Sequence, residues 1–152
     1  MPELTVTRHI DAPVETVWDV LHDFGDIQRW SGGVTESSLT SEGPVREGST
    51  RRCDFVPLGG VHERVDLHVP NERLTVKIYE TFKLPISEAT ADFNIASHDN
   101  GAELTVHYSH TLNRLGRLAK GYAEKQMRKG IGGMTKGLQT ESERIAAAPH
   151  PT

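Results

Sequence analysis

The stretch that decides the fold reads Val61-His62-Glu63-Arg64-Val65-Asp66-Leu67-His68-Val69, in which apolar and polar positions alternate. The odd-numbered positions are apolar apart from Glu63, and the even-numbered positions are all polar. A period of two is typical of a half-buried β-strand, and a register shift of one residue would bury the polar set. Glu63 is therefore predicted to point inward. Because an unpaired carboxylate in a packed core is costly, the interior must supply a partner or contain a cavity. Both options favour a ligand-binding barrel or half-barrel.

On both sides of this stretch the chain is predicted to form more strands, framed by helices. Residues 4–10 alternate as a strand. A helix begins near Pro13, a residue tolerated in the first helical turn, and ends before Gly25, and residues 27–30 add one short turn. Turn-forming residues then separate strands expected at 34–40, 49–56, 60–69, 73–79, 88–96 and 102–110. The short connections predict an antiparallel meander.

Apolar residues recur every three to five positions over residues 113–147, which predicts one long amphipathic helix. The apolar face turns along its length, so the helix either has a wide face or kinks near Gly121 or Gly130. Six glycines are unusual in a helix, since each costs up to about 1 kcal/mol against alanine. They stand at positions 116, 121, 130, 132, 133 and 137. They allow close packing against the sheet, or they leave room for a ligand or a gate that bends.

Composition narrows the classes of function. The 152 residues suit one domain, expected at 1–148 with a disordered tail at 149–152. The net charge of −4 gives no basic excess for a nucleic-acid partner. Cys53 is the single cysteine, so no intramolecular disulfide forms, and the start of the chain does not read as a signal peptide. No stretch is long and apolar enough for integral membrane association, and a cytoplasmic location is expected.

Several segments resemble one superfamily in their order and spacing. They are His9-Ile10-Asp11-Ala12-Pro13-Val14-Glu15-Thr16-Val17-Trp18, Asp23-Phe24-Gly25-Asp26-Ile27-Gln28-Arg29-Trp30, Val61-His62-Glu63-Arg64-Val65, and Leu84-Pro85 before a strand. The chain resembles the START and birch-pollen-allergen-like helix-grip superfamily (SRPBCC), in its bacterial polyketide cyclase/dehydrase and lipid-transport branch. This resemblance implies an α+β helix-grip fold, in which a seven-stranded curved antiparallel sheet wraps around a long C-terminal helix and two short helices follow the first strand. It also implies an elongated cavity that binds apolar small molecules, without a cofactor.

Strand parity and helical spacing select the residues expected to face that cavity. The ligand-binding candidates are Trp30, Arg51, Phe55, Glu63, Val65, Val76, Ala91, Phe93, Val106, Tyr108, Leu118, Tyr122, Met127 and Met134. Most are apolar, as ligand cavities usually are. Trp30 forms either a gate at the cavity mouth or ordinary packing.

Three polar residues are candidates for catalysis: Glu63, Tyr108 and His110. Glu63 is expected beside Cys53 or Phe55, one step from Arg51, where it makes a structural ion pair or serves as a polar anchor or acid/base. Tyr108 can donate to a ligand oxygen and His110 can move protons near neutral pH. Alternatively, Tyr108 fills core volume and His110 lies at a solvated strand end.

No metal site is expected. His62 and His68 are predicted on the polar face, about 20 Å apart along one strand, too far for one ion. His9 and His107 are possible sheet neighbours on the outer face. Cys53 lacks a visible base and is expected to be a small buried residue.

Three hypotheses follow for function. The first is a monomer or weak homodimer that binds a hydrophobic small molecule such as a lipid, polyketide or aromatic metabolite. The second is a polyketide aromatase/cyclase or dehydratase of the same architecture. The third is a protein-interaction module that uses the apolar groove. Polar groups converging deep inside favour the catalyst, and a large exposed apolar patch favours the interaction module.

Overall fold

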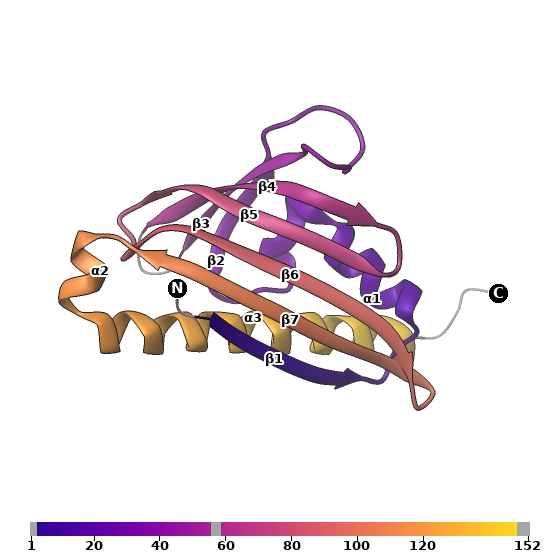
Figure 1. The fold of residues 1–152 in the computed structure, drawn as a ribbon. Coiled ribbons are helices and arrows are strands. Elements are labelled where there is room, and N and C mark those ends of the chain that lie inside the picture. The colour runs from indigo at the N-terminus through magenta and orange to yellow at the C-terminus, as the bar shows by residue number, and fades with distance from the viewer. Residues whose placement is uncertain (1–2, 56–58, 149–152) are drawn as a thin grey trace.

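Seven strands form one antiparallel sheet that curves over a long C-terminal helix (Figure 1). The computed structural model describes residues 3–55 and 59–148, so the tail predicted at 149–152 lies outside the described residues. The strand order is β1-β7-β6-β5-β4-β3-β2. The elements are β1 (Glu3–Ile10), α1 (Val14–His22), the 3₁₀ helix η1 (Phe24–Arg29), β2 (Val34–Leu39), β3 (Thr50–Phe55), β4 (Gly60–Val69), β5 (Arg73–Phe82), β6 (Ile86–His98), β7 (Gly101–Leu112), α2 (Arg114–Leu118) and α3 (Lys120–Ala147). The predicted helix-grip class and its element order are confirmed, and β5, β6 and β7 extend beyond their predicted ends.

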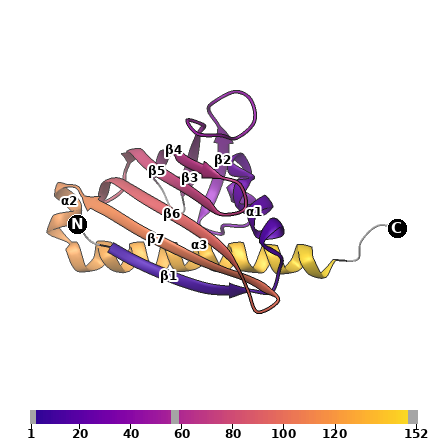
Figure 2. The same cartoon turned by 45° about the vertical axis from the view of Figure 1, so that its right-hand side comes forward.

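The alternation predicted for the strands sets the inner face of the sheet. Val61, Glu63 and Val65 of β4 are buried, while Asp66 is exposed. The row continues across β5, β6 and β7 as Leu74, Val76, Ala89, Phe93, Ile95, Leu104, Val106, Tyr108 and His110, all less than 9% exposed. This row joins the core clusters that contain the buried residues of α1 and of α3, and α3 runs beneath the sheet in both ribbon views (Figures 1 and 2).

A β-bulge corrects the prediction for His68. The pairing of β4 with β5 skips a residue between Val65 and Leu67, so His68 lies opposite the buried Leu74. An extra residue in one strand reverses which side the following residues face. His68 therefore points inward instead of onto the polar face, and its ring lies 5.3 Å from that of Trp18.

The C-terminal helix is broken into two, which corrects the prediction of one helix over 113–147. Ala119 has non-helical dihedral angles (φ −124°, ψ 47°), two residues before a predicted kink position. Asn113 caps α2 by accepting a hydrogen bond of 2.9 Å from the amide of Gly116. A Cβ on Gly116 would collide with the carbonyl oxygen of Pro85, so α2 is held tightly against the turn between β5 and β6.

The two halves of α3 are held differently. In the C-terminal half, a Cβ on Gly137 would collide with the carbonyl oxygen of Trp30, and Arg8 Nε of β1 donates to Thr135 Oγ1 at 2.8 Å. In the N-terminal half, added Cβ atoms would meet nothing within 4 Å at positions 121, 130, 132 and 133. Close packing therefore explains the glycines at 116 and 137, and the other four lower helix propensity without a packing gain. No helix in the described part of the chain is long and apolar enough to cross a bilayer.

Candidate functional site

Tyr108 and His110 lie on the inner face of β7, near the end of the strand that leads into α2. They are 5% and 4% exposed, and their ring centroids lie 5.6 Å apart. Opposite them on β6 are Ala91 and Ala89, whose small side chains fill little of the space above the sheet. The surrounding cluster is apolar: Ile86, Leu112, Ala123 and Ile131 are buried, with Met127 and Met134 packed against it.

His110 is buried without a polar partner. Neither Nδ1 nor Nε2 has a hydrogen bond to any described residue. Burial lowers the pKa of His110, and the negative charge of Glu124 opposes this only in part. The imidazole is therefore held neutral, with one nitrogen able to accept and the other to donate. The prediction that His110 lies at a solvated strand end is wrong, because β7 continues to Leu112 and α2 follows directly.

Tyr108 is a donor in the same apolar setting. Its hydroxyl donates to Met127 Sδ at 3.4 Å, and a thioether is a weak acceptor. Burial raises the pKa of Tyr108, and the charge of Glu63 raises it further. The phenol therefore stays protonated across the physiological range. The phenol of Tyr108 can donate a hydrogen bond to a ligand oxygen, and the neutral imidazole of His110 can accept a proton from the ligand.

Arg51 and Glu63 form a buried ion pair whose hydrogen-bond partners lie within the protein. Arg51 lies directly opposite Glu63 in the sheet, two residues from Cys53 and four from Phe55, the residues expected beside Glu63. Arg51 Nε donates to Glu63 Oε1 at 2.9 Å, and Nη1 donates to the carbonyl oxygen of Phe24 at 2.9 Å. The guanidinium lies 3.8 Å from the centroid of the Phe24 ring. These contacts tie β3 and β4 to η1, which favours the structural ion pair over the ligand anchor.

Cys53 adds a third contact to this carboxylate. Its Sγ donates to Glu63 Oε1 at 3.4 Å, and it is 1% exposed. Burial, followed by the charge of Glu63, raises the pKa of the Cys53 thiol. A protonated thiol is a poor nucleophile, so the predicted role as a small buried residue agrees with the structure.

The other predicted lining residues divide into two groups. Val65, Val76, Phe93 and Val106 are buried in the core, while Phe55, Ala91 and Met134 are partly buried against it. Trp30 is 6% exposed and its Nε1 has no hydrogen-bond partner in the described ranges, so it packs inside. Leu118 and Tyr122, by contrast, are 83% and 67% exposed. The prediction that these two face the interior is wrong: on either side of the break at Ala119 the buried positions are Gly116 in α2 and Ala123 in α3, which leaves Leu118 and Tyr122 outside.

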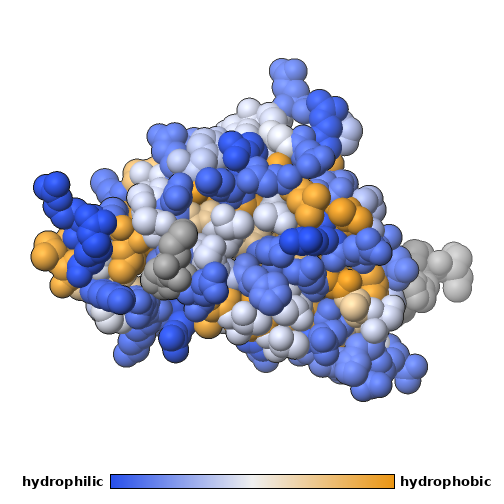
Figure 3. Space-filling view, viewed as in Figure 1, coloured by the Kyte–Doolittle hydropathy of each residue, from blue (hydrophilic) through white to orange (hydrophobic). Residues whose placement is uncertain are grey.

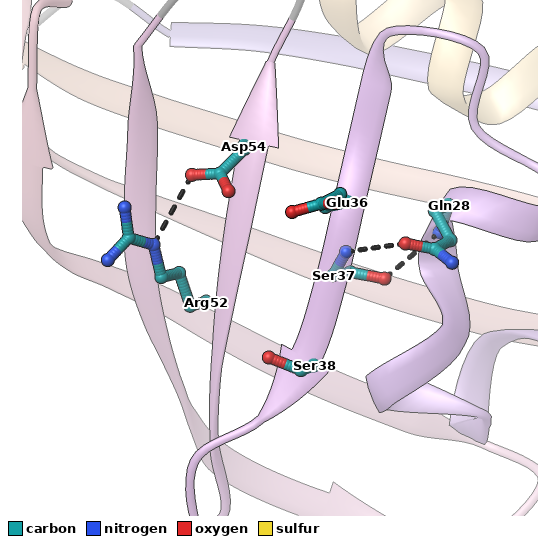
Figure 4. A pocket seen from close by; sticks show the side chains of 6 residues that line it. All are labelled: Gln28, Glu36, Ser37, Ser38, Arg52 and Asp54. Carbon is teal, nitrogen blue, oxygen red and sulfur yellow. Dashed lines mark hydrogen bonds and ion pairs between the residues drawn. The ribbon is translucent and has the colours of Figure 1, made fainter.

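Two hollows stand out on the surface of the described residues. The larger, about 470 Å³, is lined by Gln28, Glu36, Ser37, Ser38, Arg52 and Asp54, and Figure 4 shows these polar side chains on η1, β2 and β3. The second, about 310 Å³, lies along β1, β6 and β7 and is lined by Glu3, Leu4, Thr5, Thr90, Asp92, His107, Tyr108 and Ser109. The larger hollow has a polar lining, and the second includes Leu4 and Tyr108. The interior beside Tyr108 and His110 is largely closed, because these two side chains are only 5% and 4% exposed.

Sequence reasoning missed a cluster of aromatic rings. His22 and His68 lie with ring centroids 5.0 Å apart beside Trp18. Burial, followed by the charge of His22, lowers the pKa of His68. No signal in the alternation marks the bulge that brings His68 inward. Across residues 3–55 and 59–148, no three His, Cys, Asp or Glu side chains are grouped to hold a metal ion.

The seven-stranded antiparallel sheet curved over a long C-terminal helix defines a helix-grip protein. The family model for polyketide cyclase / dehydrase and lipid transport matches residues 1–143, so the chain belongs to that family. No curated protein matches this chain in sequence.

Solved structures share the fold at low sequence identity. A protein of Thermus thermophilus is 17% identical, with a TM-score of 0.81 over 96% of this chain and 100% of the other. XoxI from Bacillus cereus is 15% identical, with a TM-score of 0.78 over 97% and 100% of the two chains. The Zhui aromatase/cyclase from a Streptomyces species is 13% identical, with a TM-score of 0.74 over 95% and 93%.

Proposed function

We propose that the protein binds a hydrophobic small molecule that carries at least one polar oxygen, such as a lipid, polyketide or aromatic metabolite, between α3 and the sheet beside Tyr108 and His110. The observation that carries this proposal is His110, which is 4% exposed with neither ring nitrogen hydrogen-bonded to a described residue. A buried polar group without a partner costs about 1–3 kcal/mol, and a ligand oxygen would recover that cost. The single, buried Cys53 suits the cytoplasmic setting that we propose for this activity.

Entry of such a ligand requires the closed interior to open, and the N-terminal half of α3 is the part best suited to move. Its four glycines at 121, 130, 132 and 133 have no packing role, and the break at Ala119 separates it from α2. Met127 lies on its inner side and Met134 directly follows it, and unbranched methionines adapt to irregular shapes. The C-terminal half stays fixed through Thr135 and Gly137.

A matched pair of probes tests the proposal. Naphthol and methylnaphthalene have nearly the same shape, but only naphthol carries a hydroxyl group. We expect the protein to bind both, and His110→Leu to weaken naphthol about 5- to 30-fold while leaving methylnaphthalene within about twofold, as for loss of one hydrogen bond of about 1–2 kcal/mol. His107→Leu is the control, because His107 lies on the exposed outer face of β7. Equal losses for both probes, or binding of neither, would remove the basis of the proposal.

A cyclase or dehydratase activity is the second candidate, supported by the pairing of a neutral His110 with a protonated Tyr108. In an aldol cyclisation, His110 would remove a proton from a carbon between two carbonyls. The resulting carbanion would form a carbon–carbon bond to a second carbonyl, and Tyr108 would donate its proton to the new alkoxide. Return of the proton from His110 to Tyr108 would restore both groups.

The two candidates differ in what Tyr108→Phe changes. For a catalyst, this variant should lower the rate of cyclisation of a synthetic poly-β-ketone thioester by about 100-fold or more, as for loss of a positioned general acid. For a carrier, the purified wild-type protein should bind the thioester and leave its slow spontaneous cyclisation unchanged or retarded. The second result would eliminate the enzymatic candidate and leave the binding proposal standing.

A further inference from the structure

An apolar tip, defined here as Leu115, Leu118 and Tyr122, stands exposed on α2 and the first turns of α3. These side chains are 66%, 83% and 67% exposed. Figure 3 shows hydrophobic side chains in orange, with hydrophilic ones in blue beside them, at the end of the molecule where Figure 1 places α2. Large apolar side chains that are grouped on a surface often mark an interaction site, whereas single exposed apolar residues are common.

The tip is held in place and is not a frayed end. Asn113 Nδ2 donates to the carbonyl oxygen of Leu84 at 2.7 Å, and Gly116 packs against Pro85 without room for a Cβ. Because Gly116 takes the buried side of this short helix, Leu115 and Leu118 are presented outward. In both ribbon views α2 projects from one end of the sheet (Figures 1 and 2).

Basic residues surround the tip. Residues 114–136 contain seven basic side chains, Arg114, Arg117, Lys120, Lys125, Arg128, Lys129 and Lys136, and one acidic side chain, Glu124. All seven basic residues are exposed. This segment therefore carries +6 in a chain whose net charge is −4, which leaves −10 on the rest of the sequence. Positive charge is therefore concentrated on the segment that begins at the tip and continues along α3.

We propose that the apolar tip and its basic surround dock on an anionic lipid bilayer, with Leu115, Leu118 and Tyr122 inserted at the interface. Apolar side chains flanked by Lys and Arg match the two layers of such a surface, acyl chains below and anionic headgroups above. Tyrosine is favoured at that boundary. A bilayer accepts a projecting end without a preformed groove, whereas a protein partner must supply one.

Docking in this orientation places the proposed entry route at the membrane. The N-terminal half of α3, which follows the tip directly, carries Lys125, Arg128 and Lys129 on its exposed side. An apolar molecule could then pass between bilayer and interior without crossing water. The docking surface itself stands on exposure and charge alone, so it is tested without any bound ligand.

Vesicle sedimentation of the full chain tests the proposal. Vesicles of phosphatidylcholine alone are compared with vesicles of three parts phosphatidylcholine to one part phosphatidylglycerol. We expect binding to the anionic vesicles at least about 10-fold stronger, with the preference reduced at high salt because headgroup attraction is screened. The double variants Leu115→Ser/Leu118→Ser and Arg114→Ser/Arg117→Ser should each lower binding by about 10-fold or more.

Matched controls separate docking from a general loss of apolar or basic surface. Leu39→Ser/Tyr79→Ser removes two other large exposed apolar residues, which are 40% and 41% exposed on β2 and β5. Arg46→Ser removes a basic residue exposed between β2 and β3. Both controls should bind within about twofold of the parent, as for residues far from the bilayer. Thermal unfolding midpoints check that all variants are folded.

A Leu118→Trp variant reports insertion directly. Its added fluorescence should shift to the blue on anionic vesicles, since the indole leaves water. Binding without a blue shift would reduce the interaction to surface adsorption and overturn the inserted tip. The proposal is also overturned if the protein does not bind vesicles, if it binds both vesicle types equally, or if the control variants lose as much binding as the tip variants. An acidic protein partner would then be the remaining explanation.

Discussion

Glu63→Gln should destabilise the fold severely, because it removes the charge that neutralises buried Arg51. The two residues are 8% and 4% exposed, and their side chains are joined at 2.9 Å. Removal of one partner from a buried ion pair typically costs about 3–5 kcal/mol. Arg51 keeps its hydrogen bond to the Phe24 carbonyl and its contact with the Phe24 ring, so the expected loss is about 3 kcal/mol, the lower end of that range.

Urea unfolding followed by tryptophan fluorescence measures this loss, since Trp18 and Trp30 are both buried. For a domain of this size, a loss of about 3 kcal/mol lowers the midpoint by about 1–2 M urea. The double variant Arg51→Met/Glu63→Leu removes both charges and should lie much nearer to the parent than either single variant. The control is Asp66→Asn, which breaks the exposed ion pair with Arg64 on the same strand and should leave the midpoint unchanged.

The reasoning is refuted by either of two results. If the two single losses simply add in the double variant, Arg51 and Glu63 are not coupled as the geometry requires. If Glu63→Gln leaves the urea midpoint near the parent value but weakens binding of naphthol, Glu63 is a ligand anchor, and the structural interpretation is wrong.

Three further predictions concern the interior and the long helix. In urea titrations, Gly130→Ala should raise the free energy of unfolding by up to about 1 kcal/mol, because the added Cβ meets no other atom within 4 Å. Gly137→Ala should lower the free energy of unfolding, because its Cβ would collide with Trp30. The reverse order would contradict the packing described. His110→Leu should stabilise the protein by about 1–2 kcal/mol at pH 7.5, since it removes a polar group without a partner, and a loss of stability would indicate a hidden partner. Burial lowers the pKa of His110 and of His68, so below about pH 6.5 the unfolded chain binds more protons than the folded chain. The free energy of unfolding should therefore decline between about pH 6.5 and 5 and remain level above that range. This slope should be shallower in His110→Leu, and an unchanged slope would mean that His110 is not buried neutral.

The sequence predicted the inner face of the sheet well, because alternation records which side chains avoid water. Arg51, Cys53 and Glu63 face inward as expected. Cys53 contacts Glu63 as expected, but the residue paired with Glu63 is Arg51, two residues further from the turn than Cys53. The alignment depends on the turn between β3 and β4 and not on the alternation. His68 was misplaced for a related reason: a bulge adds one residue to a strand without disturbing its apolar pattern.

The candidate site was predicted in part. Tyr108 was placed on the correct face, but the burial of His110 depends on the extension of β7 to Leu112 and on the helix that follows it. Leu118 and Tyr122 were assigned to the interior because helical spacing presumes an unbroken helix, and the break at Ala119 invalidates that spacing. The basic surround of the tip is visible in the sequence itself, but the net charge of −4 conceals it.

Methionine methyl NMR tests the central claim most directly. The chain has three methionines, and two of them, Met127 and Met134, pack against the cluster around Tyr108. With ¹³C-labelled methionine methyl groups, addition of naphthol should shift the Met127 and Met134 signals together, and His110→Leu should require a several-fold higher concentration for the same shift. If naphthol leaves both signals unmoved at concentrations where it binds the protein, the ligand lies elsewhere, and the claim of an interior site beside His110 is contradicted.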